Sequence, residues 1–190
     1  MLSNNAKVAE RVGAAVEKSG DLSDRIGLGG VFHFKCYDKD GNLKWEESTH
    51  NLVVNEGLKD LNDKYFSGAS YSATWYLGLV NASPSPSYAA GDTLASHAGW
   101  SETTDYSGNR KAVTFGAATL ADPSVISNTA VPSQFSMTGT VTVAGAFLCT
   151  AATGTSGVLF SVSSFQAPGN RSVVSGDTLS VTYQFSADAA

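Results

Sequence analysis

The chain has 190 residues, of which 42% are hydrophobic, and a formal charge of −5 at pH 7. This length suits one domain with an appended arm, and the acidic balance argues against a nucleic-acid partner. There is no run of 18 apolar residues, and the first residues lack the basic-then-apolar order of a secretory signal, so we expect neither a membrane span nor export.

Charge is distributed unevenly along the chain. Residues 1–65 carry 9 Lys/Arg and 11 Asp/Glu, whereas residues 66–190 carry only 3 and 6. About 25% of the residues of an ordinary soluble domain are charged. The sparse charge after residue 65 favours a surface that pairs with copies of itself or with a larger assembly. The alternative is the hydroxyl-rich surface of a monomeric β-protein.

Residues 4–19 are predicted to form an N-terminal helix with a narrow stripe of small apolar side chains. The stripe consists of Val8, Val12, Ala15 and Val16. Such a helix orders by lying on its own domain or on a neighbouring subunit, and we expect it to cross to a neighbour as the assembly segment. Residues 20–30 are expected to be a flexible linker. The predicted domains are therefore an arm and linker over residues 1–29 and a folded domain over residues 30–190.

The clearest hairpin is expected over residues 31–37 and 43–50, with Asp40-Gly41 in the turn, where glycine adopts a positive φ without steric cost. Residues 38–42 also place side-chain oxygens at alternate positions, as a calcium loop does. However, the glycine comes too early, and the twelfth position is Thr49 rather than a bidentate acid, so a turn is favoured over a metal site.

The chain after this hairpin is predicted to hold one short helix and many short strands. Residues 51–54 continue extended, and Asn55 caps a helix in which Leu58, Leu61 and Tyr65 share one face. The later strands are expected over residues 73–80, 111–118, 125–127, 134–137, 139–149, 157–162 and 177–186. The first of these is continuously apolar and is expected to be buried on both faces, and the fifth changes faces near Ala144-Gly145, as at a β-bulge.

The strongest strand signal lies near the end of the chain. Leu179, Val181, Tyr183 and Phe185 alternate with small polar residues, which places four apolar side chains on one face. Another layer must cover that face. We therefore predict a mainly β fold, an antiparallel β-sandwich of jelly-roll or Greek-key type, with an N-terminal helical arm and one short helix after the first hairpin.

Candidate catalytic and metal-binding residues are few. The three histidines are scattered, and Cys36 and Cys149 are far apart, which favours two reduced thiols over a disulfide or a zinc site. His97 follows Ser96, but adjacency in sequence does not make a catalytic pair, and a structural role in a loop is expected. We predict no catalytic residue, no metal and no cofactor.

Two further groups of side chains leave alternatives open. The carboxylates Glu46-Glu47 and Asp92, Glu102 and Asp105 are candidates for the paired acids of glycoside hydrolysis, although carboxylates on strands more often face water. Six aromatic residues are candidates for a sugar-binding face, although aromatic residues more often belong to a β-core. These six are Tyr71, Trp75, Tyr76, Tyr88, Trp100 and Tyr106.

Three sets of segments resemble, in the same order, a widespread group of tailed-bacteriophage structural proteins. The segments are residues 51–58; 74–79 leading to 90–102; and 143–148 with 176–183. The most specific part is Asp-Thr-Leu-Ala-Ser-His-Ala-Gly-Trp-Ser-Glu at residues 92–102. The resemblance covers residues 30–186 and implies a non-enzymatic component of the particle with no catalytic residues.

The resemblance implies a virion protein made in the bacterial host cytoplasm. The expected function is a capsid decoration or cement protein that binds the outer head surface as a homo-oligomer. Its expected partners are the major capsid protein and copies of itself, with no nucleic acid and no membrane. The alternatives are a tail or fibre component that contacts host-surface glycans and, from another class, a glycan-active enzyme.

Overall fold

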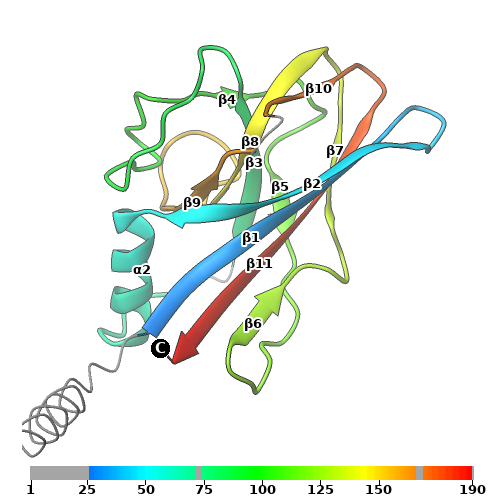
Figure 1. Ribbon diagram of the computed structural model, residues 1–190. Helices are drawn as coiled ribbons and strands as arrows, with labels where there is room; N and C mark the ends of the chain where they lie inside the picture. The colour runs from blue at the N-terminus through cyan, green and yellow to red at the C-terminus, as the bar shows by residue number, and fades with distance from the viewer. Residues whose placement is uncertain (1–25, 72–73, 166–168, 190) are drawn as a thin grey trace, which may run out of the picture.

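The computed structural model describes residues 26–71, 74–165 and 169–189, which form a mainly β domain with one helix (Figure 1). The predicted helical arm, with Val8, Val12, Ala15 and Val16, lies outside the described residues. Among those that are described, no helix has the length and apolar character needed to cross a bilayer.

The strands range from two to twelve residues in length and follow one another in both halves of the chain. The first half contains β1 (Ile26–Tyr37), β2 (Leu43–Val53), β3 (Trp75–Asn81), β4 (Glu102–Thr103) and β5 (Lys111–Val113), and the helix α2 (Asn55–Tyr65) follows β2. The second half contains β6 (Ser124–Ser127), β7 (Ser133–Ser136), β8 (Val141–Cys149), β9 (Leu159–Ser163), β10 (Arg171–Val173) and β11 (Thr178–Ala189).

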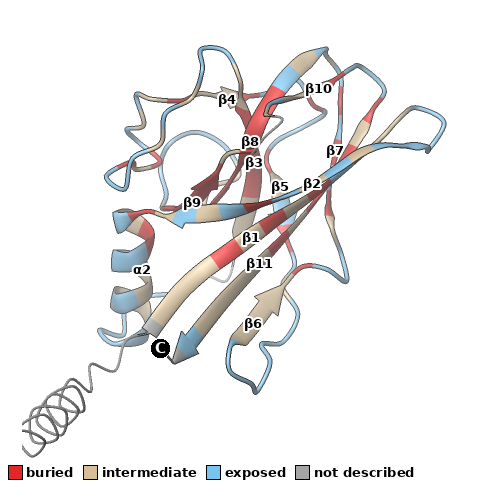
Figure 2. Cartoon of the chain, viewed as in Figure 1, coloured by how far each residue is buried: buried red, intermediate tan, exposed pale blue. Residues whose placement is uncertain are grey.

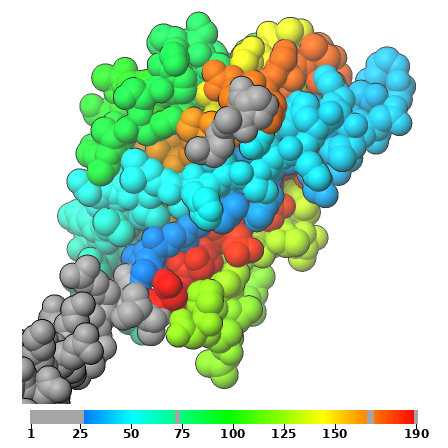
Figure 3. Space-filling model, in the orientation of Figure 1, coloured from blue at the N-terminus to red at the C-terminus, as the bar shows by residue number. Residues whose placement is uncertain are grey.

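One antiparallel sheet folds over to form both layers of the domain. Its strand order is β4-β3-β8-β9-β2-β1-β11-β6, with β5 on β3, β7 on β11 and β10 on β8. Strand β2 belongs to both layers, because residues 43–50 pair with β1 while residues 51–53 pair with β9. Figure 3 shows β1, β2 and β11 side by side on one face. The predicted mainly β, sandwich-like antiparallel fold is confirmed.

The main core lies between the two layers. Every second side chain of β1 and β11 points into it. Phe32, Phe34 and Cys36 of β1 are opposite Tyr183, Val181 and Leu179 of β11, and all six side chains are buried. Leu77 and Leu79 of β3 face them from the other layer. Figure 2 shows buried positions running along the middle of these strands. The predicted apolar face of residues 177–186 is confirmed.

A second core covers the outer face of β3, β8 and β9. The chain after β3 folds back over this face, so that Leu94 and Trp100 pack with Val80, Phe147 and Leu159. This explains why residues 77–80 are buried without alternation: one face meets the main core and the other meets the folded-back chain.

The predicted bulge in β8 lies at Ala144. Val80 pairs with Gly145 and Asn81 with Val143, so Ala144 is the extra residue. As a result Val143 and Ala146 both face the main core, whereas Ala144 faces the second one. The bulge is therefore what lets one strand supply apolar side chains to two cores.

Two predicted features are wrong in detail. Residues 26–30, assigned to a flexible linker, begin β1, and Gly30 is needed there because a Cβ would lie 2.7 Å from the Tyr183 hydroxyl. Asn55 does not cap the helix, which begins after Val54 without a side-chain cap, and of the three residues expected on one face Leu58 and Tyr65 are exposed while Leu61 is partly buried. Strands β4 and β10 were not predicted because two- and three-residue strands carry no periodicity.

Candidate interaction surface

An apolar cavity of about 210 Å³ has Phe185 and Ile126 in its lining, near the end of the sandwich at which β1 begins and β11 ends. Its lining comes from α2, β6, β8, β9, β11 and the chain around β3 and β5. The lining residues are Leu61, Tyr71, Trp75, Phe115, Ile126, Leu148, Phe160, Tyr183 and Phe185. None of these described side chains is charged, so the cavity offers apolar contact and little else.

Exposed aromatic side chains accompany the residues that line this cavity. Tyr71, which lines it, is 63% exposed, and Tyr65 and Phe66 are 80% and 75% exposed. Tyr65 ends α2 one turn after Leu61, Phe66 follows it, and their rings pack edge to face with centroids 4.9 Å apart. We call these three residues together with Leu61, Trp75, Phe115, Ile126 and Phe185 the apolar end surface. Apolar groups gathered and exposed in this way mark interaction sites.

The helix that borders this surface is fixed by its first turn. A Cβ on Gly57 would lie 2.4 Å from the Phe160 carbonyl oxygen, so only glycine allows α2 to approach β9 this closely. The Glu56 carboxylate accepts hydrogen bonds from the backbone N–H of Leu94 (3.0 Å) and of Leu159 (2.6 Å). These contacts hold α2 so that Leu61 lines the cavity.

The floor of the cavity is closed by a buried tyrosine. The Tyr183 hydroxyl accepts hydrogen bonds from Asn51 Nδ2 at 3.0 Å and from Ser161 Oγ at 3.4 Å. Burial raises the pKa of Tyr183 well above its usual value, so the group stays a neutral phenol. The hydroxyl therefore serves to join β11 to β2 and β9 rather than to carry charge.

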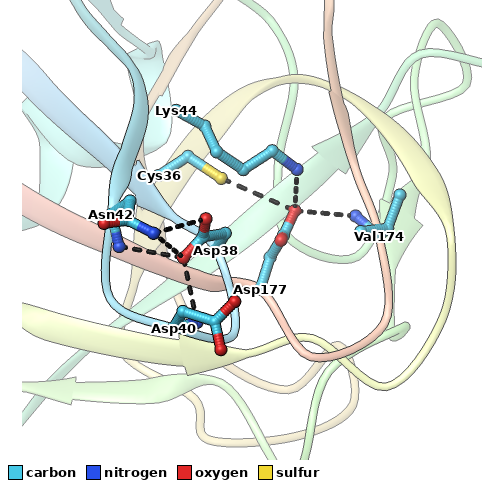
Figure 4. A network of polar contacts seen from close by, with 7 residues as sticks. All are labelled: Cys36, Asp38, Asp40, Asn42, Lys44, Val174 and Asp177. Atoms are coloured by element: carbon cyan, nitrogen blue, oxygen red, sulfur yellow. Dashed lines mark hydrogen bonds and ion pairs between the residues drawn. The ribbon is translucent and has the colours of Figure 1, made fainter.

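A polar network occupies the end of β11 away from this cavity, before the strand begins (Figure 4). Asp177 accepts hydrogen bonds from Lys44 Nζ at 2.5 Å and from the backbone N–H of Val174 at 2.9 Å, and Cys36 Sγ lies 3.8 Å away. Burial, and then the charge of Asp177, raise the pKa of Cys36 to about 11. Cys36 and Cys149 are both buried and neither forms a disulfide, as predicted.

The loop with calcium-like spacing is a hairpin turn. Asp38 Oδ1 accepts hydrogen bonds from the backbone N–H of Asp40 (2.9 Å) and of Asn42 (2.8 Å), and Gly41 has a φ of +85° (Figure 4). Asn42 Nδ2 also donates a hydrogen bond to Asp38 Oδ2 at 3.0 Å. The hydrogen bonds from the side chain of Asn42, and then from its backbone, lower the pKa of Asp38. Within residues 26–71, 74–165 and 169–189, no three His, Cys, Asp or Glu side chains are grouped to hold a metal ion.

The carboxylates considered for glycoside hydrolysis have structural partners. Glu102 accepts hydrogen bonds from Arg110 Nε (3.0 Å) and Nη2 (2.8 Å) and from the Tyr106 hydroxyl (3.2 Å). Asp92 accepts one from Trp100 Nε1 at 3.0 Å, and Asp105 one from Thr103 Oγ1 at 2.9 Å. Glu47 pairs with Arg171 and Glu46 with Lys35. These contacts join strands and loops to one another.

The aromatic residues considered for a sugar-binding face do not share one exposed face, since Tyr76, Tyr88 and Trp100 pack together in the second core. Trp100 and Tyr106 are buried in different cores. The His97 ring stacks on Trp100 with centroids 4.0 Å apart, and its Nδ1 lies 2.9 Å from the Thr93 carbonyl oxygen. His97 therefore has the structural role predicted for it. Of the six aromatic residues, Tyr71 and Trp75 belong to the apolar end surface.

Sequence reasoning missed the apolar end surface because its residues come from segments far apart in the chain. The one local signal was Tyr65-Phe66 and Tyr71 on either side of a Ser/Gly/Ala loop, where a solvent-facing loop has no need of three aromatic rings. Comparison of the chain with family models, curated proteins and solved structures finds no match. The surface is therefore assigned from geometry alone.

Proposed function

We propose that this protein is a structural component of a tailed-bacteriophage virion: a capsid decoration or cement protein that binds the outer head surface as a homo-oligomer and stabilises the shell. The apolar end surface is the observation that carries this proposal, because an exposed aromatic rim around an apolar cavity favours association. The resemblance of residues 30–186 to phage virion proteins, strongest over residues 92–102, indicates the kind of assembly.

The distribution of charge supports a role in protein contact. Residues 66–190 carry nine charged side chains, and several of these are already paired, as in Arg110–Glu102, Lys44–Asp177 and Arg171–Glu47. Removing an unpaired ion from water costs several kcal/mol, whereas apolar and hydroxyl-bearing surfaces lose much less on contact. Sparse and paired charge therefore lowers the free-energy cost of burying this surface against other subunits.

The proposed mechanism has no chemical step. Each copy binds the major capsid protein and other copies, and symmetry repeats the same contacts over the shell. A specific interface typically buries roughly 1,600 Å² in total, and apolar area contributes about 25 cal/mol per Å² before the costs of association. Because the protein binds the assembled shell and not its dissociated state, binding raises the stability of the shell by mass action.

The direct test adds purified full-length protein to expanded, undecorated heads of the same phage. We expect saturable co-sedimentation with the heads and a higher melting temperature of the shell in calorimetry. A Phe66→Ser/Tyr71→Ser variant will bind less well, whereas Leu43→Ser, an exposed change in the β1–β2 hairpin, serves as the matched control. Heads that neither retain the protein nor change their melting temperature would refute the proposal.

A tail or fibre component that binds host glycans is the second candidate, and one observation favours it. Tyr71 and Trp75 lie on the same apolar surface and present ring area there. Retention on host cells or on their polysaccharide, with no binding to heads, would support this candidate. Release of sugar that is lost in Glu102→Gln or Asp105→Asn would instead support the glycan-active enzyme.

A further inference from the structure

We propose that the apolar end surface is the docking site for residues 4–19 of a neighbouring copy of this chain. The inference rests on the homo-oligomer proposed above and names the contact that joins its copies. It names residues 4–19 as the occupant of the apolar cavity, which the described residues of the domain do not fill.

The segment and the surface are matched in chemistry. The predicted helix over residues 4–19 has a stripe of small apolar side chains that is too narrow to order it in water, so it needs an apolar partner. The stripe consists of Val8, Val12, Ala15 and Val16. The cavity of about 210 Å³ has no charged side chain in its lining, and valine and alanine side chains are small enough to enter it. On an ideal helix of 3.6 residues per turn, Glu17 would fall opposite this stripe.

The segment also starts at the right end of the molecule. The described chain begins at Ile26, which pairs with Ala189, and the cavity residue Phe185 is opposite Gly30. Four strand residues correspond to roughly 13 Å at about 3.3 Å per residue. The six residues 20–25 span up to about 20 Å when extended. The segment therefore begins within reach of a cavity at this end.

The proposed homo-oligomer favours the cavity of a neighbour over that of the same chain. Strand β1 begins at this end of the sandwich, where Ile26 is opposite Ala189 (Figure 1). Docking on the same chain would bury the stripe without joining two copies, whereas docking on a neighbour supplies the contact that a homo-oligomer needs. A two-fold arrangement lets each copy give its segment and receive the other.

Cysteine cross-linking of full-length chains tests the docking. Val12→Cys is mixed with isotopically labelled Tyr71→Cys under mild oxidation, and the products are analysed by non-reducing electrophoresis and mass spectrometry. We expect a disulfide between a labelled and an unlabelled chain. Cys36 and Cys149 are buried and will not compete. The matched control replaces Tyr71→Cys by Leu43→Cys, which is exposed in the distant hairpin and should give no cross-link with Val12→Cys.

A double variant separates docking on a neighbour from docking on the same chain. With Val12→Cys and Tyr71→Cys in one chain, a link within a single chain, at monomer mass, would overturn the assignment to a neighbour. Absence of any Val12–Tyr71 link would overturn the docking itself. Independently, Val12→Lys should shift the sedimentation coefficient from oligomer to monomer while the β-sheet circular dichroism stays unchanged, whereas Glu17→Lys should leave the sedimentation coefficient unchanged. An oligomer that persists in Val12→Lys would contradict the inference.

These experiments use no phage heads, so their failure is distinct from failure of the proposed function. A cross-link between chains that do not bind heads would leave the docking in place and refute the capsid role. Chains that bind heads but form no cross-link would refute the docking and leave the capsid role in place.

Discussion

A single glycine decides how closely α2 approaches the sheet. We predict that Gly57→Ala lowers the free energy of unfolding by about 1–3 kcal/mol, because its Cβ would meet the Phe160 carbonyl oxygen at 2.4 Å. Helix propensity alone would favour alanine by about 1 kcal/mol, so the sign of the change distinguishes the two effects. Urea unfolding measures it. Gly29→Ala is the control, since a Cβ there meets nothing within 4 Å; equal effects of both changes would contradict the prediction.

The buried thiol of Cys36 should make the free energy of unfolding decrease as the pH rises through the alkaline range. Burial raises the pKa of Cys36 from 9.0 to about 11, so the folded state holds its proton where the unfolded state has lost it. The stabilisation is fully present below pH 9 and is lost as the pH rises toward 11, by at most about 1.4 kcal/mol per pH unit. Cys36→Ala should flatten this slope in urea unfolding series. A slope that is the same in both proteins would contradict the assignment.

At the scale of elements, α2 is joined to two distant segments by one carboxylate. Glu56→Ala leaves the backbone N–H groups of Leu94 and Leu159 without an acceptor, each at a cost of about 1–3 kcal/mol. We predict that the free energy of unfolding falls by about 2 kcal/mol or more, and by less in Glu56→Gln, which keeps one oxygen acceptor. Lys59→Ala, exposed on the same helix, is the control for loss of helix charge. Equal stability of Glu56→Ala and Lys59→Ala would refute this role.

At the scale of the whole molecule, the apolar end surface should control self-association independently of folding. Phe66 and Tyr71 are mostly exposed, so Phe66→Ser/Tyr71→Ser should change the melting temperature little but shift the protein toward smaller species. Sedimentation velocity over a concentration series measures this shift. Leu43→Ser removes a comparable exposed side chain elsewhere and should leave association unchanged. If Phe66→Ser/Tyr71→Ser left self-association unchanged, the contact between copies would have to lie on another surface.

Local sequence patterns correctly predicted the strands in which apolar residues follow a regular pattern, because the layers packed on those strands require it. Alternation over residues 177–186 identified the core face of β11, the unbroken apolar run identified β3, and the change of faces near Ala144 identified the bulge in β8. Each of these signals is carried by residues close together in the chain. The three glycines at positions 27, 29 and 30 were misleading, because the sequence does not distinguish a glycine needed for mobility from one needed for close packing, as Gly30 is against Tyr183.

By itself, the sequence determined the antiparallel β class, the positions of the longer strands and the uneven distribution of charge. Only the tertiary structure decided that Leu61, Phe115, Ile126 and Phe185 meet around one cavity, and that Glu47 pairs with Arg171. The physical reason is the range of the interactions. Periodicity reports which face of a strand is apolar, whereas the residues that share a surface are set by contacts between different segments, some of them more than a hundred positions apart.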